Sequence, residues 1–174
     1  MVNGICMVNS IFPLEINNRV SGILKLCKQK GVTIVTAESC TGGLIAGCLT
    51  EVPGSSAVIE GGFVTYSNQA KMSMISVKLE QLDQYGAVSE EVARSMAEGA
   101  LGSSKADIAI ACTGVAGPGG ATDTKPVGLV HLSCASRKHP TSHKKCNFSG
   151  ERSTIRLATV NAAFGLIEAQ LNLI

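Results

Sequence analysis

Hydrophobic and polar positions along the chain follow two periods, one typical of helices and one typical of strands. Apolar residues three and four positions apart predict helices, and short Val- and Ile-rich runs bounded by glycine predict buried strands. Predicted helices span residues 14–30, 44–52, 70–76, 79–85, 90–101 and 152–173, and predicted strands span residues 32–37, 58–66, 108–112, 127–135 and 144–148. Ser89 is the expected N-cap of the helix at residues 90–101, and Gly31 follows the first helix as a C-terminal cap.

The order of these elements indicates the fold class. Helices alternate with strands over the first two-thirds of the chain, which is typical of an α/β fold. The last two strands are joined by a short basic turn and predict a β-hairpin, and a long helix follows. We therefore expect a single-domain α/β fold, with a mixed β-sheet, helices on both faces, and a C-terminal β-hairpin plus long helix. The domain is expected to span residues 14–174, with residues 1–13 as a poorly defined leader.

Composition and charge narrow the possible functions. The chain has 174 residues, of which 45% are hydrophobic and only 16% charged, a profile far from that of disordered proteins. The formal net charge is +2, and the one basic cluster, at residues 137–145, lacks interleaved aromatic residues. We therefore expect no nucleic-acid partner. No segment approaches the ~20 apolar residues of a membrane helix, so no membrane association is expected either.

The cysteines and histidines point to a reducing compartment and to no metal. Seven cysteines are present, without a CxxC pair, and most lie in apolar runs where a reduced thiol acts as a small hydrophobe. This pattern predicts a cytoplasmic protein. His139, His143 and Cys146 have the only spacing that resembles a metal site, and a fourth ligand is missing.

Three polar, glycine-rich segments, at residues 38–43, 66–71 and 113–120, each follow a predicted strand. Any one of them is expected to be a tight connection and nothing more. In open α/β sheets, however, ligands bind at the carboxyl ends of strands, so the three segments together predict the walls of a pocket. Neither the P-loop pattern nor GxGxxG is present.

The first and second of these segments carry candidate catalytic residues. Ser39 and Thr41 precede a helix N-terminus, where free amides favour a phosphate or an oxyanion. A serine nucleophile needs a base, and the three histidines all lie in the late hairpin, so we expect Lys71 in a dry pocket to accept the proton. Tyr66 would relay that proton or hold the ligand. Cys40 is a rival nucleophile, and residue chemistry alone leaves the choice open.

Six segments, in order and with family-like spacing, closely resemble the CinA carboxyl-terminal domain family, which includes the stand-alone nicotinamide-nucleotide amidases. The resemblance covers nearly the whole chain from residue 14. The segments are residues 36–43 (TAESCTGG), 62–71 (GFVTYSNQAK), 85–89 (YGAVS), 113–120 (TGVAGPGG), 125–128 (KPVG) and 148–152 (FSGER).

The resemblance implies hydrolysis of nicotinamide mononucleotide to nicotinate mononucleotide and ammonia, in pyridine-nucleotide salvage. It implies Ser39 as nucleophile, which decides against Cys40, with Lys71 as base and Tyr66 beside it. Arg152 is implied as the residue that binds the substrate phosphate. Other substrate-binding positions are expected in the two glycine-rich loops, at Cys40, Thr41, Gly42, Gly43, Thr113, Gly114 and Gly117.

No metal and no organic cofactor are implied, and the resemblance together with the long apolar final helix suggests a homodimer. Two other functions stay open. One is a non-catalytic nucleotide-binding module, which would need the same loops but not both Ser39 and Lys71. The other is an interaction protein associated with competence or DNA repair, which would need no polar pocket.

Overall fold

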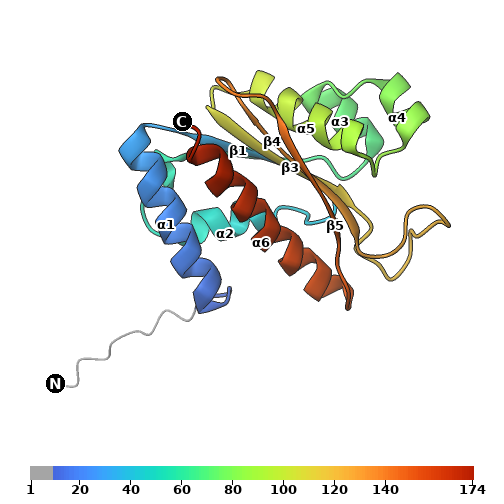
Figure 1. Ribbon diagram of the computed structural model, residues 1–174, viewed down its shortest axis with the longest axis horizontal. Coiled ribbons are helices and arrows are strands. Elements are labelled where there is room, and N and C mark those ends of the chain that lie inside the picture. The colour runs from blue at the N-terminus through green and yellow to red at the C-terminus, as the bar shows by residue number, and fades with distance from the viewer. Residues whose placement is uncertain (1–9) are drawn as a thin grey trace.

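The computed structural model describes residues 10–174, and its elements follow the predicted order (Figure 1). Most of the expected leader, residues 1–9, lies outside the described residues. The elements are α1 (Leu14–Lys30), β1 (Ile34–Glu38), α2 (Leu44–Glu51), the short 3₁₀ helix η1 (Ser55–Ala57), β2 (Ile59–Val64), α3 (Asn68–Ile75), α4 (Leu79–Tyr85), α5 (Glu90–Gly102), β3 (Ile108–Gly114), β4 (Leu129–Ser136), β5 (Ser142–Asn147) and α6 (Arg152–Leu171).

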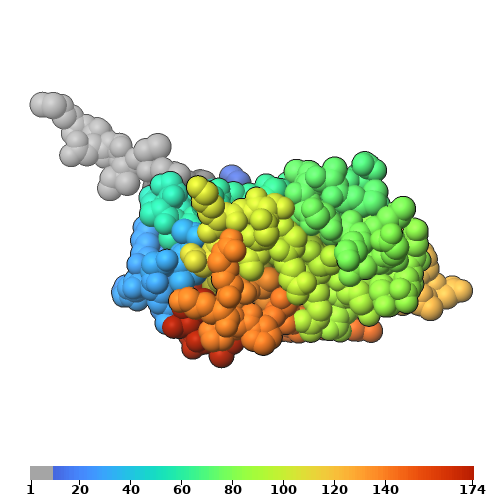
Figure 2. Space-filling view, turned by 90° about the horizontal axis from the view of Figure 1, so that it is seen from above, coloured from blue at the N-terminus to red at the C-terminus, as the bar shows by residue number. Residues whose placement is uncertain are grey.

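The five strands form one mixed sheet in the order β2-β1-β3-β4-β5. Strand β1 pairs in parallel with both β2 and β3, whereas β4 pairs antiparallel with β3 and with β5. Helices α1, α2 and α6 cover one face, and α3, α4 and α5 cover the other (Figure 1). Figure 2 looks onto the second layer, which is green to yellow. The expected α/β fold, with its C-terminal hairpin and long helix, is confirmed.

Alternation along β3 explains the two hydrophobic cores. Ile108, Ile110 and Cys112 point to the core under α1, α2 and α6, while Ala109 and Ala111 point to the core under α5. The small alanines let α5 approach the sheet closely. Helices α5 and α3 of the second layer also pack closely against each other. A Cβ at Gly99 of α5 would lie 1.9 Å from the carbonyl oxygen of Ile75, at the end of α3.

Several element boundaries differ from the sequence prediction by one or two residues, and three of them have a clear local reason. Helix α3 begins two residues early because the Ser67 hydroxyl accepts the Ala70 amide at 3.0 Å and caps the helix. Strand β4 begins two residues late because Gly128, at φ +93°, turns the chain against the Phe148 carbonyl, where a Cβ would lie only 1.9 Å away. Strand β5 begins at Ser142 rather than at 144 because pairing with β4 extends to Cys134.

The parallel part of the sheet determines where the glycine-rich loops meet. Glu38, the last residue of β1, lies opposite Val64 at the end of β2 and opposite Cys112 near the end of β3. The three loops therefore leave the sheet at the same edge, as the sequence predicts. No helix within residues 10–174 has both the length and the apolar character needed to cross a membrane.

Candidate active site

A cavity of about 270 Å³, here called the Ser39 cavity, lies where the three loops meet. All three loops and the first residue of α6 contribute to its wall. Its lining residues are Ser39, Cys40, Tyr66, Asn68, Lys71, Ala87, Val88, Thr113, Gly114, Val115, Ala116, Gly117, Gly119, Gly120 and Arg152. The structure thus brings together residues that lie up to 113 positions apart.

Ser39 and Lys71 form a hydrogen-bonded pair in the wall of this cavity. The Nζ atom of Lys71 lies 3.0 Å from Ser39 Oγ and donates to the Thr65 carbonyl oxygen at 2.8 Å. Lys71 is 1% exposed, although it lies on a short surface helix. Burial lowers the pKa of the amine from its ordinary value, because the charged form loses hydration. The pair therefore joins a hydroxyl to an amine that is biased toward its neutral, proton-accepting form.

The turn that carries Ser39 is attached to the neighbouring strand. The Ser39 amide donates to the Cys112 carbonyl oxygen at 3.1 Å, which continues the pairing of β1 with β3 by one residue. Only 9% of Ser39 is exposed, so the serine is less accessible than a surface loop residue. The nucleophile candidate is therefore held in one position by the sheet.

A buried carboxylate, that of Glu38, occupies the N-terminus of α2. Its Oε2 accepts the Thr41 hydroxyl at 2.6 Å and the Gly43 and Ile45 amides, each at 3.0 Å, and its Oε1 accepts the Ala46 amide at 2.8 Å. Glu38 is fully buried. The sequence pattern alone did not reveal this role, because the partners of Glu38 become neighbours only when the turn folds.

Three of the predicted substrate-binding residues lie in this turn but outside the cavity wall. Thr41, Gly42 and Gly43 do not line the Ser39 cavity. The Thr41 hydroxyl and the Gly43 amide bind Glu38, and the Gly42 amide donates to the Ser39 carbonyl oxygen at 3.2 Å. These three donors are thus used within the protein. Among residues 10–174, the Cys40 amide is the cavity-lining N–H of this turn that has no protein acceptor.

Cys40 lies beside the serine but has a different environment. The neighbouring Cys112 thiol, together with burial, raises the pKa of the Cys40 thiol well above its ordinary value. A thiol with a raised pKa is a poor nucleophile near neutral pH. The geometry therefore favours Ser39 over Cys40, a choice that residue chemistry left open.

Tyr66 and Arg152 lie together at the mouth of the cavity. The Arg152 guanidinium donates from Nη1 to the Gly117 carbonyl oxygen at 2.9 Å and from Nη2 to the Tyr66 hydroxyl at 3.4 Å. The phenol of Tyr66 is therefore directed to Arg152, and only its backbone carbonyl approaches Lys71 Nζ, at 3.5 Å. The Tyr66 side chain therefore does not lie between Ser39 and Lys71, where a proton relay would need it, and a ligand-holding role at the exposed mouth stays a prediction.

The third loop forms the wall opposite the serine. Thr113, Gly114 and Gly117 line the cavity as the sequence predicts, and the Thr113 hydroxyl donates to the Ala87 carbonyl oxygen at 2.8 Å. Gly117 has φ +78°, and a Cβ there would lie 2.8 Å from Val127 Cγ1, so the loop requires glycine at this position. Sequence analysis did not single out Asn68, Ala87 or Val88 as lining residues, although all three fall inside the family-like segments.

The basic cluster of the hairpin lies apart from the Ser39 cavity. Arg137 donates to the carbonyl oxygens of Leu101, Ser104 and Ala106 and so connects β4 to the loop after α5. His143 packs on His131 rather than beside Cys146, and no group of three or more potential metal ligands is found within residues 10–174.

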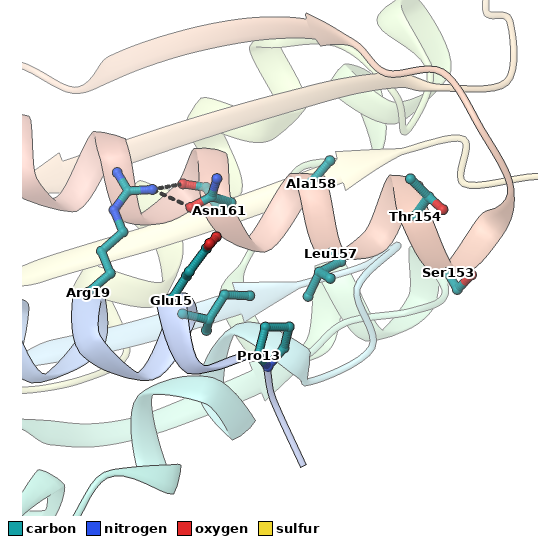
Figure 3. Close-up of a pocket in the computed structure, with 9 residues that line it drawn as sticks. Pro13, Glu15, Arg19, Ser153, Thr154, Leu157, Ala158 and Asn161 are labelled. Carbon is teal, nitrogen blue, oxygen red and sulfur yellow. Dashed lines mark hydrogen bonds between the residues drawn. The ribbon is translucent and has the colours of Figure 1, made fainter. Parts of the chain in front are cut away.

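A cavity of about 650 Å³ between α1 and α6 contains none of the predicted site residues. Figure 3 shows Arg19 of α1 reaching Asn161 of α6 along its edge. Glu15, Leu157 and Ala158 also line it. It is separate from the chemistry of the Ser39–Lys71 pair.

Comparison with known proteins places the chain in one family. A family model described as the CinA C-terminal domain matches residues 17–171. A CinA-like protein from Endomicrobium trichonymphae is 44% identical over 168 residues, which cover 97% of this chain and 39% of that protein. A CinA-like protein from Chloroherpeton thalassium is 44% identical over 98% of this chain and 40% of its own length. The chain thus spans well under half the length of the curated relatives that it matches.

Two solved structures have the same fold. The competence/damage inducible protein CihA from Agrobacterium tumefaciens has a TM-score of 0.91 and 49% sequence identity, over 94% of this chain and 99% of that one. A competence-damaged protein (CinA) superfamily protein from Escherichia coli has a TM-score of 0.82 and 34% identity, over 91% of this chain and 90% of that one.

Proposed function

The chain belongs to the CinA C-terminal domain family, and we propose that it is an amidohydrolase that converts nicotinamide mononucleotide to nicotinate mononucleotide and ammonia. The observation that carries the proposal is the Ser39 Oγ to Lys71 Nζ distance of 3.0 Å in the wall of a polar cavity. The choice of substrate rests on the six family-like segments, whose family includes the nicotinamide-nucleotide amidases.

The reaction would pass through an acyl-enzyme. Neutral Lys71 accepts the Ser39 proton while Oγ attacks the carboxamide carbon, and the developing oxyanion lies near the Cys40 amide. The C–N bond then breaks, and protonated Lys71 gives its proton to the departing ammonia. Water attacks the acyl carbon, Lys71 accepts the proton of that water, and Ser39 leaves with a proton returned from Lys71. Every proton transfer uses one amine, whose lowered pKa makes the neutral, proton-accepting form easier to reach than in an exposed lysine.

Arg152 and Tyr66 would bind the nucleotide part of the substrate. Their contact places a guanidinium and a phenol at the cavity mouth, 3.4 Å apart. A guanidinium binds phosphate through two parallel N–H donors, and an exposed aromatic ring provides a surface for a sugar or a base. We place the carboxamide at Ser39 and the phosphorylated end beyond Arg152.

A non-catalytic binding module is the second candidate function. Such a module would use the same cavity, but it would gain nothing from a buried lysine hydrogen-bonded to a serine, because a buried amine lowers stability. An interaction protein for competence or DNA repair is a third candidate, in keeping with the names of the solved relatives. Cytoplasmic location, a role in pyridine-nucleotide salvage and a homodimeric state belong to the same proposal as the amidase.

The test is release of ammonia from nicotinamide mononucleotide by the purified protein. We expect Ser39→Ala to lower kcat by at least about 10³-fold and to lower the free energy of unfolding by no more than about 1–2 kcal/mol, because the buried Lys71 amine loses one of its hydrogen-bond partners. Cys40→Ala is the matched control and should keep most of the activity. Activity should also survive dialysis against a strong chelator. Loss of activity in Cys40→Ala with retention in Ser39→Ala would reject the mechanism.

A further inference from the structure

The Ser39 cavity is small for a mononucleotide, but a second cavity adjoins it. The Ser39 cavity has about 270 Å³, just below the roughly 300 Å³ at which small-molecule sites begin. The neighbouring cavity, here called the Arg156 cavity, has about 630 Å³. Arg152 and Gly117 line both cavities, and their hydrogen bond lies between them. A ligand that enters the Ser39 cavity therefore has room to extend past Arg152.

Arg156 lies in the second cavity, one helical turn after Arg152 on α6. Its Nη2 donates to the Thr41 carbonyl oxygen at 2.6 Å, and its Nε is buried without a partner among the described residues. Neither Arg156 nor Arg152 takes part in an ion pair within residues 10–174. A half-buried guanidinium with an unsatisfied N–H and no counter-charge is unfavourable unless an anion binds beside it.

We propose that the Arg156 cavity binds the phosphate of the substrate, and that Arg156 shares this phosphate with Arg152. The inference rests on the proposed function and deepens it by naming a residue and a cavity that select phosphorylated substrates. Residues four apart lie on the same side of a helix, and both arginines line the Arg156 cavity, so one ligand bound there can contact both. Two planar forks match the several oxygens of a phosphate dianion better than one does.

The link between Arg156 and the nucleophile turn makes a purely structural role the main competing explanation. Arg156 binds the carbonyl of Thr41, two residues after Ser39, so its loss also disturbs the turn. A disturbed turn would lower kcat for every substrate. Loss of a phosphate contact would instead raise KM for phosphorylated substrates alone, which separates the two roles.

The first experiment compares Arg156→Gln and Arg156→Lys with the native protein on nicotinamide mononucleotide and on nicotinamide riboside, which lacks the phosphate. We expect KM for the mononucleotide to rise about tenfold or more in Arg156→Gln, with a change of less than about twofold for the riboside. Arg156→Lys keeps a donor for the Thr41 carbonyl and should show the same selective loss, to a smaller degree. Lys144→Gln removes an exposed charge of β5 and is the matched control. An equal loss on both substrates would overturn the proposal.

Glu151 provides a test in the opposite direction. Its carboxylate lines the Arg156 cavity and repels an anion there. Glu151→Gln should therefore lower KM for the mononucleotide several-fold and leave the riboside unchanged. An unchanged or raised KM for the mononucleotide would contradict a phosphate site in this cavity.

A binding measurement keeps this inference separate from the amidase proposal. Calorimetric titration of the Ser39→Ala protein with the mononucleotide and with inorganic phosphate needs no turnover. Weaker binding of both when Arg156→Gln is added supports the phosphate site even if no ammonia is ever released. Unchanged binding overturns it even if the native protein is an active amidase.

Discussion

Lys71 combines two properties that conflict in a folded protein. It is among the most deeply buried large side chains of the described chain, yet it ends in an ionisable amine. Its contacts with Ser39 Oγ and with the carbonyl oxygens of Thr65 and Tyr66 replace only part of the hydration that a charged amine loses on burial. A protonated amine in this position lowers stability, and a neutral amine there serves as a base. The residue therefore exchanges stability for chemistry.

Lys71→Met tests this exchange, because methionine keeps the length and removes the amine. We expect kcat on nicotinamide mononucleotide to fall by about 10²–10⁴-fold, while the free energy of unfolding at pH 7 rises by about 1–2 kcal/mol in a urea titration. Lys78→Met is the matched control, since Lys78 is exposed before α4, and it should change neither quantity much. A less stable Lys71→Met protein would show that the lysine is held for structure.

The expected pH dependence of the proposed amidase activity follows from the same amine. Because burial lowers the pKa of Lys71 below its ordinary 10.5, the neutral base is already present at lower pH than for an exposed lysine. We expect kcat/KM to rise with pH along a limb whose midpoint lies below 10.5. A rising limb with its midpoint at or above 10.5, measured by ammonia release, would contradict a buried Lys71 as the base.

Site residues that belong to recurrent local patterns can be predicted from the sequence. Residues whose role depends on contacts made only in the folded chain cannot. Ser39 and Lys71 were candidates because each lies in a polar loop after a strand. Arg156 was missed because its partner, Thr41, is 115 positions away, and Glu38 because its acceptor role requires the turn. Such contacts leave no periodic signal in the sequence.

At the scale of elements, α2 depends on a residue that precedes it. The N-cap residue, Gly43, has no side chain with which to cap the helix, and Glu38 supplies the missing acceptor from the end of β1. A negative charge at a helix N-terminus also interacts favourably with the helix dipole. The Glu38 carboxylate thus joins β1, the turn that carries Ser39, and α2 into a single unit.

Glu38→Gln should loosen this unit. The amide NH₂ group of glutamine would meet N–H donors, so at least one buried donor loses its acceptor. We expect a loss of about 2–4 kcal/mol in the free energy of unfolding and a lower kcat with a smaller change in KM, because Ser39 is misplaced. Glu60→Gln, on the exposed side of β2, is the control. Equal stability of the two variants in urea would show that Glu38 does not hold the turn.

Most helices and strands are predictable from the sequence, because the spacing of apolar residues that indicates them is a local feature. Helix α1 was predicted with the bounds that the structure shows, since a continuous apolar stripe ends at a glycine in the left-handed conformation. The start of β4 was not predictable, because Gly128 packs against the Phe148 carbonyl of the last strand region. Boundaries fixed by tertiary contacts are those that the sequence pattern missed.

At the scale of the whole molecule, the long final helix is used within the chain. Its apolar residues, among them Ile155, Phe164 and Ile167, are fully buried against β3, β4 and α1. The helix therefore gives little support to the self-association surface that its composition suggested. The expected homodimer stays a prediction that rests on the family resemblance.

Acid sensitivity of the whole fold is expected from two stacked histidines, whose rings pack with centroids 5.2 Å apart. His131 Nδ1 lies 3.0 Å from His143 Nε2, and His143 Nδ1 lies 3.2 Å from Glu90. Burial lowers the pKa of both histidines below 6.5. Between the folded and unfolded pKa values, the unfolded chain binds more protons, so stability falls as the pH drops below about 6.5.

The carboxylate in this cluster acts in a separate pH range. The hydrogen bond from Arg94 lowers the pKa of Glu90 below 4.5, so its stabilising contribution is complete above 4.5 and is lost only at lower pH. The first loss on acidification is thus assigned to the histidines. We expect the urea midpoint of the native protein to fall between about pH 7 and 5, and His131→Gln/His143→Gln to reduce that fall. His139→Gln should leave it unchanged. Protonation of the histidine stack is expected to weaken the β4–β5 hairpin and its contact with Glu90 of α5. If the double variant is as acid-sensitive as the native protein, other groups cause the loss of stability.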